Sequence, residues 1–293
     1  MTKGAAFGAG TGLAAFALFA AALVSYPAST IAESGAGQNP HEQPPPPPQE
    51  WSFAGPFGRY DHAQLQRGFQ VYREVCANCH SLKLVAFRNL ADPGGPGFSE
   101  EQVKALAAAY KIKDGPNDAG EMFERAGRPS DYFPWNFANE QAARAALGAV
   151  PPDLSLIAKA RTYERGFPQF LIDPFIQYQE HGPDYIYALL NGYTHEDDLN
   201  WNEYMPGHKI AMPKPLADGI VDYADGSPKT VPQYAKDVTA FLMWAAEPKL
   251  EERKKLGMSV LGFLGIYALL LFAAKKKIWS RAKARPGPDL PLG

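Results

Sequence analysis

The sequence predicts a mainly α-helical domain with long loops, followed by one membrane-spanning helix near the C-terminus. Apolar residues recur at helical spacing in several segments, while the alternation typical of strands is weak throughout. One segment near the C-terminus carries no charge at all. The chain also has 27 prolines among its 293 residues, which favours ordered loops between the helices.

Two helices are expected in the first half of the domain. The first has its apolar positions at Leu65, Phe69, Tyr72 and Cys76, so we expect it to present Cys76 on its apolar face. The second covers residues 100–110, where Ser99 is in place to cap the helix and to form a capping box with the glutamine three residues later.

Two more helices are expected in the second half. Residues 184–190 form a short apolar segment that Gly192 can end. The segment after Thr230 has a threonine at the cap position, Pro232 in the first turn and Gln233 three residues after the cap. These features predict a helix that begins directly after Thr230.

The uncharged C-terminal segment covers residues 256–274. About 20 residues of apolar helix cross the hydrocarbon core of a bilayer, and a core helix of this length normally keeps a polar stripe. The segment is followed by a basic cluster comprising Lys275, Lys276, Lys277, Arg281, Lys283 and Arg285. Clusters of Lys and Arg next to a membrane span usually remain in the cytoplasm. We therefore expect residues 275–293 to be a cytoplasmic tail and the preceding domain to be periplasmic.

The N-terminus predicts export across the inner membrane. Lys3 precedes an uncharged run over residues 4–24 and then several small residues, which is the order of a secretory signal peptide. We assign residues 1–32 to a cleaved signal, with a retained anchor as the alternative. Residues 33–50 contain a proline run and predict an extended tether, so the domain covers residues 51–250.

Charge and hydropathy exclude two classes of protein. The formal net charge is −2, so no overall basic field supports binding to nucleic acid. A mean hydropathy of −0.28 excludes a polytopic membrane protein. The chain is therefore expected to be an exported domain on a single membrane anchor.

The two cysteines of the chain carry its most specific signal. Cys76 and Cys79 are followed at once by His80, which gives the pattern C-x-x-C-H. At this spacing two thiols can join the vinyl groups of one haem while the imidazole reaches its iron. A redox dithiol would need a βαβ context, and a zinc site would need a second pair of Cys or His ligands. Neither is found in the sequence.

An iron that only transfers electrons needs a sixth ligand, and a thioether suits this role. Met205 and Met212 lie in a loop rich in proline and glycine, and the two prolines that closely follow Met212 favour it. His208 in the same loop is a third candidate. Met243 lies in the helix after Thr230, where core packing is the simpler interpretation.

Several segments together resemble the cytochrome c1 family, the haem c subunits of cytochrome bc1 complexes. They follow the order of the family and cover most of the chain after residue 51. The matching segments are RGFQVYREVCANCHS (67–81), PPDLS (151–155), GPDYIY (182–187), IAMPKPL (210–216), YADGSPKT (223–230) and AKDVTAFLMWAAEP (235–248).

The resemblance implies a class I c-type cytochrome domain and a set of roles. One haem c would be bound covalently through two thioethers from Cys76 and Cys79, with its iron held by His80 and Met212. Arg161 and Tyr185 match positions that contact a haem propionate in the family; the alternatives are a surface charge for Arg161 and a core aromatic for Tyr185. Pro152 matches a proline on the histidine side of the haem.

The resemblance also implies a function and partners. The chain would take electrons from a Rieske iron–sulfur protein and pass them to a soluble cytochrome c, beside cytochrome b, in a dimeric complex in the inner membrane. It would make and break no bonds itself, as one subunit of a proton-translocating quinol–cytochrome c reductase. The alternatives are a free-standing membrane-anchored cytochrome c shuttle, or the haem subunit of another dehydrogenase or oxidase. A haem enzyme or gas sensor would need an open sixth position, which Met212 disfavours.

Two features of the loop before Met212 remain open. Glu196, Asp197 and Asp198, with Glu203 nearby, form an acidic cluster that either steers a basic cytochrome c or is merely a solvated loop. Some bacterial members of the family carry an extra cysteine pair in this loop, and this chain has none. We therefore expect packing and prolines to supply its rigidity.

Overall fold

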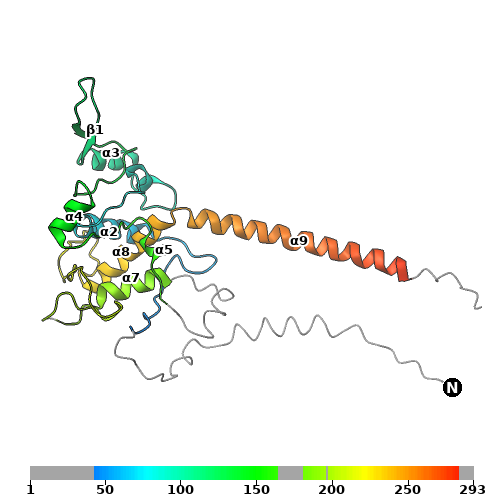
Figure 1. Ribbon diagram of the computed structural model, residues 1–293. Coiled ribbons are helices and arrows are strands. Elements are labelled where there is room, and N and C mark those ends of the chain that lie inside the picture. Colours follow the sequence, from blue (N-terminus) through cyan, green and yellow to red (C-terminus); the bar gives the residue numbers. More distant parts are fainter. Residues whose placement is uncertain (1–42, 164–180, 196, 284–293) are drawn as a thin grey trace, which may run out of the picture. The chain divides into compact units, whose positions relative to one another are not determined.

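The computed structural model describes residues 43–163, 181–195 and 197–283 (Figure 1), and the element labels follow that figure. The predicted signal peptide and most of the predicted tether lie outside the described residues. The elements are α2 (His62–Glu74), η1 (Cys76–Asn78), η2 (Phe87–Ala91), α3 (Glu100–Ala108), β1 (Lys111–Asp114), β2 (Phe123–Ala126), α4 (Glu140–Leu147), α5 (Ile157–Ala160), α7 (His181–Asn191), α8 (Val231–Ala246) and α9 (Leu250–Lys283).

Helices α2 and α8 pack closely because one residue at their contact has no side chain. A Cβ atom on Gly68 would lie 2.1 Å from the backbone oxygen of Asp237, so any other residue would push the helices apart. The fully buried carboxylate of Asp237 is paired across the contact, because the Nε of Arg67 donates to it at 2.9 Å. The pairing offsets part of the cost of burying that carboxylate.

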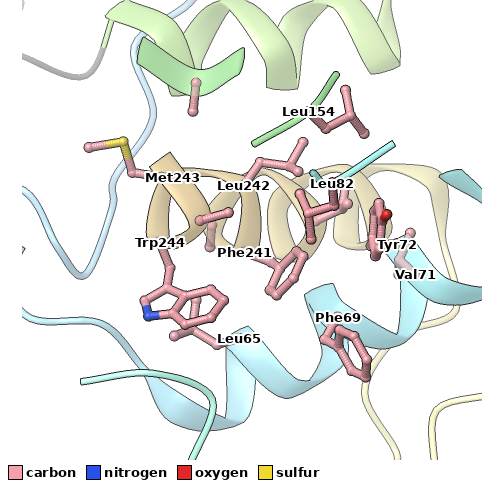
Figure 2. Close-up of a cluster of buried hydrophobic side chains, with 14 of the residues drawn as sticks. Leu65, Phe69, Val71, Tyr72, Leu82, Leu154, Phe241, Leu242, Met243 and Trp244 are labelled. Atoms are coloured by element: carbon pink, nitrogen blue, oxygen red, sulfur yellow. The ribbon is translucent and has the colours of Figure 1, made fainter. Parts of the chain in front are cut away.

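The hydrophobic core is centred on this helix pair. Figure 2 shows apolar side chains of α2 and α8 facing one another, joined by two leucines from the segments that follow the C-x-x-C-H motif and the PPD sequence. Each such side chain contributes roughly 1.5–3 kcal/mol when fully buried. The labelled members are Leu65, Phe69, Val71, Tyr72, Leu82, Leu154, Phe241, Leu242, Met243 and Trp244.

The other elements surround the pair. Helices α5 and α7 both contact α8 and one another, and α3 contacts η2. Strands β1 and β2 form an antiparallel hairpin in which Lys111 pairs with Ala126 and Asp114 with Phe123. The hairpin was not expected, because its strands have only four residues each and are mostly exposed, so they lack a hydrophobic alternation. The mainly α-helical class is confirmed.

The helix ends agree with the sequence in some places and differ in others. Ser99 caps α3 and forms the expected capping box with Gln102. The prediction that α2 carries Cys76 on its apolar face is wrong. Helix α2 ends at Glu74, and Cys76 lies in the 3₁₀ turn that follows. Helix α8 begins after Thr230 as predicted, but the threonine side chain makes no capping bond. The carboxylate of Asp218 accepts from the N–H of Val231 instead, at 2.7 Å.

The last residues of the predicted tether lie against the domain. The backbone N–H of Gln49 and the indole N–H of Trp51 both donate to the same carboxylate oxygen of Asp184, at 3.0 and 2.8 Å. Pro46 is buried. The stretch after residue 43 is therefore attached to α7 over part of its length.

Helix α9 is uninterrupted from Leu250 to Lys283 (Figure 1), and it includes the predicted span. Its mean hydropathy reaches 2.2 in an 18-residue window, and none of that window is buried against the rest of the described chain. The first turns of the helix contact the domain. Glu251 accepts from the N–H of Tyr60 at 3.0 Å, and Lys254 donates to the carbonyl of Phe53 at 2.5 Å.

Candidate haem site

The C-x-x-C-H motif folds into one tight turn directly after α2. The N–H groups of Cys79 and His80 both donate to the carbonyl of Cys76, at 3.1 and 2.9 Å. Both cysteines and the histidine are half-buried. The turn therefore gathers two sulfur atoms and an imidazole within five residues, as covalent haem attachment requires.

A second segment braces this turn from outside. The indole N–H of Trp135 donates to the carbonyl of Cys79 at 2.9 Å, and the amide of Asn136 donates to that of Ala77 at 2.8 Å. These bonds satisfy carbonyls that a short 3₁₀ turn leaves without internal partners. Neither residue was predicted from the sequence, because a Trp-Asn pair about 56 residues away carries no local signal for such contacts.

The tautomer of His80 follows from its partner. Its Nδ1 lies 2.8 Å from the carbonyl oxygen of Pro152, which can only accept, so Nδ1 carries the proton. The lone pair of the neutral ring is then on Nε2. Burial lowers the pKa of His80, and the Pro152 carbonyl and the Asp153 carboxylate offset only part of that shift. The neutral ring is the form that binds a metal.

The carbonyl of Pro152 is held in place by the next residue. The carboxylate of Asp153 accepts from the hydroxyl of Ser81 at 2.7 Å and from the N–H groups of Lys83 and Ser155, both at 2.9 Å. Burial acts to raise the pKa of Asp153, but these hydrogen bonds outweigh it and the pKa is lowered. The ionised carboxylate thus ties the PPD segment to the residues that follow His80.

The thiol chemistry disfavours a redox dithiol. Burial, together with the neighbouring Cys79, raises the pKa of Cys76 to about 12. Reactive dithiols need a thiolate and hence a lowered pKa. Among the described residues, no group of three or more His, Cys, Asp or Glu suited to a metal ion occurs. The expected haem fits this motif better than a redox dithiol.

Three methionines were considered as the sixth ligand, and they lie in different surroundings. Met243, in α8, is 6% exposed and belongs to the hydrophobic core of the domain, as predicted. The sulfur of Met205 accepts a weak hydrogen bond from the hydroxyl of Tyr185 at 4.0 Å. Met212 is half-buried and packs against the same core cluster as Cys76, and its carbonyl accepts from the hydroxyl of Tyr193 at 2.9 Å.

The third candidate in that loop, His208, is engaged in local contacts. Its Nδ1 lies 3.2 Å from the carbonyl of Asn202, and its ring stacks on Trp201 with 5.1 Å between centroids. These contacts explain its position without a metal. The pair of His80 and Met212 stays a prediction, which rests on the C-x-x-C-H spacing and on the family resemblance.

Arg161 and Tyr185 lie near one another. Arg161 is exposed directly after α5, and Tyr185 is 7% exposed in α7. Burial raises the pKa of Tyr185, and the positive charge of Arg161 opposes the shift. A guanidinium and a tyrosine hydroxyl can each donate to a carboxylate such as a haem propionate. Among the predicted site residues, the structure joins His80 to Pro152 by a hydrogen bond, and it links Arg161 to Tyr185 through the charge of the arginine.

Comparisons with known proteins identify the family of the chain. A model described as the Cytochrome C1 family matches residues 51–282. A protein named "Cytochrome b/c1" from Bradyrhizobium diazoefficiens is 62% identical over 244 residues, which are 80% of this chain and 36% of that protein. This chain therefore spans about a third of that relative.

Two further relatives have lengths closer to this chain. A cytochrome c1 from Blastochloris viridis is 51% identical over 266 residues, covering 87% of this chain and 92% of the relative. A cytochrome c1 from Rhodospirillum rubrum is 46% identical over 259 residues, covering 80% and 88%. The family match extends from the first core tryptophan through the apolar helix α9, and on this ground the chain belongs to the cytochrome c1 family.

Proposed function

We propose that this chain is the haem c subunit of a quinol–cytochrome c oxidoreductase of the cytochrome bc1 type. It would accept electrons from a Rieske iron–sulfur protein and deliver them to a soluble cytochrome c. The bound haem would supply one-electron chemistry. The observation that carries the proposal is the bond from His80 Nδ1 to the carbonyl of Pro152, which leaves Nε2 free for iron.

The residues of the chain would bind and orient one haem. Cys76 and Cys79 would form the two thioether links, and His80 and Met212 would hold the iron. Arg161 and Tyr185 would bind a propionate, and Pro152 would orient the imidazole through its carbonyl. A neutral imidazole and a thioether favour the reduced iron and so a relatively high potential.

Helix α9 would place this domain at the membrane. The apolar span would cross the bilayer once, with the basic residues after it in the cytoplasm and the haem domain in the periplasm. Cytochrome b and a Rieske protein would lie beside it in a dimeric complex. The length and hydropathy of α9 and the uninterrupted basic cluster support this arrangement.

The acidic cluster would contribute to docking of a basic electron acceptor. Asp197 is exposed, but Asp198 is paired with Lys209, which lowers the pKa of Asp198 and reduces the local negative charge. Glu196 lies outside the described residues. Such charges act mainly on the rate of encounter, so their effect should decline as salt increases.

A reduced-minus-oxidised spectrum tests the proposal. The tagged chain would be purified from its own membrane in mild detergent. Haem b bands beside a haem c band, with quinol–cytochrome c activity, are the expected result. A haem c band alone, under conditions that keep such complexes intact, would favour a free-standing shuttle instead. Absence of covalent haem would overturn the proposal.

A further inference from the structure

The segment from Gly192 to Met212 connects α7 to the proposed sulfur ligand, and we call it the ligand loop. It contains no cysteine, so no disulfide can hold it. Its described residues form no helix or strand, apart from one isolated bridge between Trp201 and Lys209. A ligand on such a loop binds iron reliably only if other contacts fix the backbone.

Asn202 is at the centre of those contacts. It is one of few buried polar residues, with 0% of its surface exposed. Its side-chain amide donates to the carbonyl of Leu189 in the last turn of α7 at 2.7 Å. The oxygen of the same amide accepts from the N–H of Tyr204 at 3.0 Å. One side chain thus links the end of a helix to a turn of the ligand loop.

The backbone of Asn202 links the second arm of the loop. Its N–H donates to the carbonyl of His208 at 2.9 Å, and its carbonyl lies 3.2 Å from Nδ1 of that histidine. His208 has a φ of 58°, the one positive φ among the described non-glycine residues. That left-handed conformation is costly for a residue with a side chain, so these bonds and the stacking on Trp201 must stabilise it.

The hydrogen bonds continue from this centre toward Met212. Asn200 and Ile210 exchange two bonds, with the N–H of Ile210 donating at 3.0 Å and the amide of Asn200 donating back at 2.9 Å. The N–H of Lys214 donates to the carbonyl of Leu199 at 3.1 Å. Residues on both sides of Met212 are therefore tied to the arm that Asn202 anchors.

Gly192 allows this anchor to approach the helix. A Cβ atom there would lie 2.9 Å from the amide oxygen of Asn202 and 2.8 Å from the ring of Tyr204. The carbonyl of Gly192 also accepts from the N–H of Glu203 at 2.9 Å. The absence of a side chain at this position is thus a condition for the buried position of Asn202.

We propose that Asn202 is the positioning residue of the sixth ligand, because its buried amide fastens the ligand loop to α7. The proposal rests on the proposed function, in which Met212 binds the haem iron. Asn202 would not touch the haem and would act only through the loop. The side-chain donor and acceptor are both used. Removing the amide therefore leaves the N–H of Tyr204 without this acceptor, and the carbonyl of Leu189 keeps only the bond from the N–H of Gly192 at 3.2 Å.

The test compares Asn202→Ala with Asn191→Ala in the intact complex. Asn191 is a suitable control because its amide donates to the carbonyl of Tyr187 within α7 and does not contact the ligand loop in any described bond. We expect Asn202→Ala to keep its covalent haem. It should weaken the sulfur-to-iron charge-transfer band of the oxidised protein, lower the midpoint potential, and increase carbon monoxide binding to the reduced protein about tenfold or more. Asn191→Ala should match the wild type in all three.

A second variant covers the case in which Asn202→Ala does not assemble. Asn202→Asp has the same shape and keeps the acceptor for Tyr204, but it loses the donor to Leu189 and places a carboxylate oxygen beside that carbonyl. We expect the same three changes, and restored binding of Met212 when the carboxylate is protonated at lower pH. If Asn202→Asp and Asn202→Ala both keep the wild-type band, potential and carbon monoxide affinity, Asn202 is not the positioning residue.

The wild type and Met212→Leu separate this proposal from the function it rests on. If Met212 is not a ligand, the wild type will bind carbon monoxide readily or Met212→Leu will change nothing, and the proposed function fails first. If the wild type excludes carbon monoxide and Met212→Leu admits it, the ligand is established. The Asn202 variants then decide the positioning role alone.

Discussion

The two proposed iron ligands lie in regions that are built in opposite ways. His80 follows the cysteines within one tight turn, directly after the buried helix α2. Met212 is at the end of a loop without regular structure, held by hydrogen bonds between residues that are distant in the sequence. The first region is specified by local spacing, while the second depends on the rest of the fold. Damage to the fold should therefore loosen the methionine before the histidine.

The largest effect is expected in the turn that contains Cys76, Cys79 and His80. Replacement of both Cys76 and Cys79 by serine should abolish covalent haem attachment, because no other thiol exists in the chain. Haem staining after denaturing electrophoresis measures this directly. A stained band of the correct mass in the double variant would show that the attachment site had been assigned wrongly.

Met212→Leu should affect the proposed sulfur ligand and leave the covalent attachment of haem unchanged. The substitution nearly conserves volume, so it should cost less than about 1.5 kcal/mol of stability and leave the covalent haem in place. Loss of the thioether should lower the midpoint potential and open the iron to carbon monoxide. Met205→Leu is the matched control in the same loop and should behave as the wild type in the redox titration. Equal shifts in both variants would contradict the choice of Met212.

Two substitutions with smaller effects each remove one hydrogen bond, one from the loop of Met212 and one from the turn of His80. Tyr193→Phe removes the hydroxyl that donates to the carbonyl of Met212, and Trp135→Phe removes the indole N–H that donates to the carbonyl of Cys79. Each change should cost about 1 kcal/mol of stability, measured by thermal unfolding in detergent. Only Tyr193→Phe should weaken the methionine charge-transfer band. If Trp135→Phe weakens the charge-transfer band equally, the turn of His80 and the loop of Met212 are not independent.

The smallest effect depends on pH. The pKa of Asp153 is lowered from 3.8 by its hydrogen bonds, so its ionised form stabilises the folded state above that value and the contribution declines as pH falls through the lowered pKa. Asp153→Asn should therefore cost about 1 kcal/mol at neutral pH, a figure reduced by solvent screening, and progressively less below pH 3.8. Thermal unfolding of both proteins across this range measures the difference, and a constant difference at all pH values would contradict the assignment.

Much of the histidine side could be predicted from the sequence. The C-x-x-C-H spacing predicts His80 as an iron ligand, which stays a prediction, and the helical spacing of apolar residues before it predicts α2. The helical spacing of apolar residues did not predict that α2 ends at Glu74. Cys76 continues that spacing, although the backbone there already forms a 3₁₀ turn. The braces from Trp135 and Asn136 were not predictable, since they depend on contacts between distant segments.

The loop that holds Met212 was harder to predict from the sequence. Prolines after Met212 favoured it, but nothing in the local pattern indicated that Asn202 would be buried, because asparagine in a loop is normally exposed. The cap of α8 shows the same limit. Thr230 has the expected position, yet the side chain of Asp218, twelve residues earlier in the chain, supplies the bond. The tertiary structure, and not the local sequence, places this acceptor at the start of α8.

The attachment of α9 has a consequence for how this domain moves. Three residues separate α8 from α9, and Glu247 among them pairs with both Lys159 and Arg253. The bonds of Glu251 and Lys254 to residues 53–60 add a second fastening. A domain joined to the apolar helix in this way has little freedom to rotate relative to it. In the proposed function, the electron donor and the acceptor would therefore have to move, because this domain would stay fixed relative to its membrane helix.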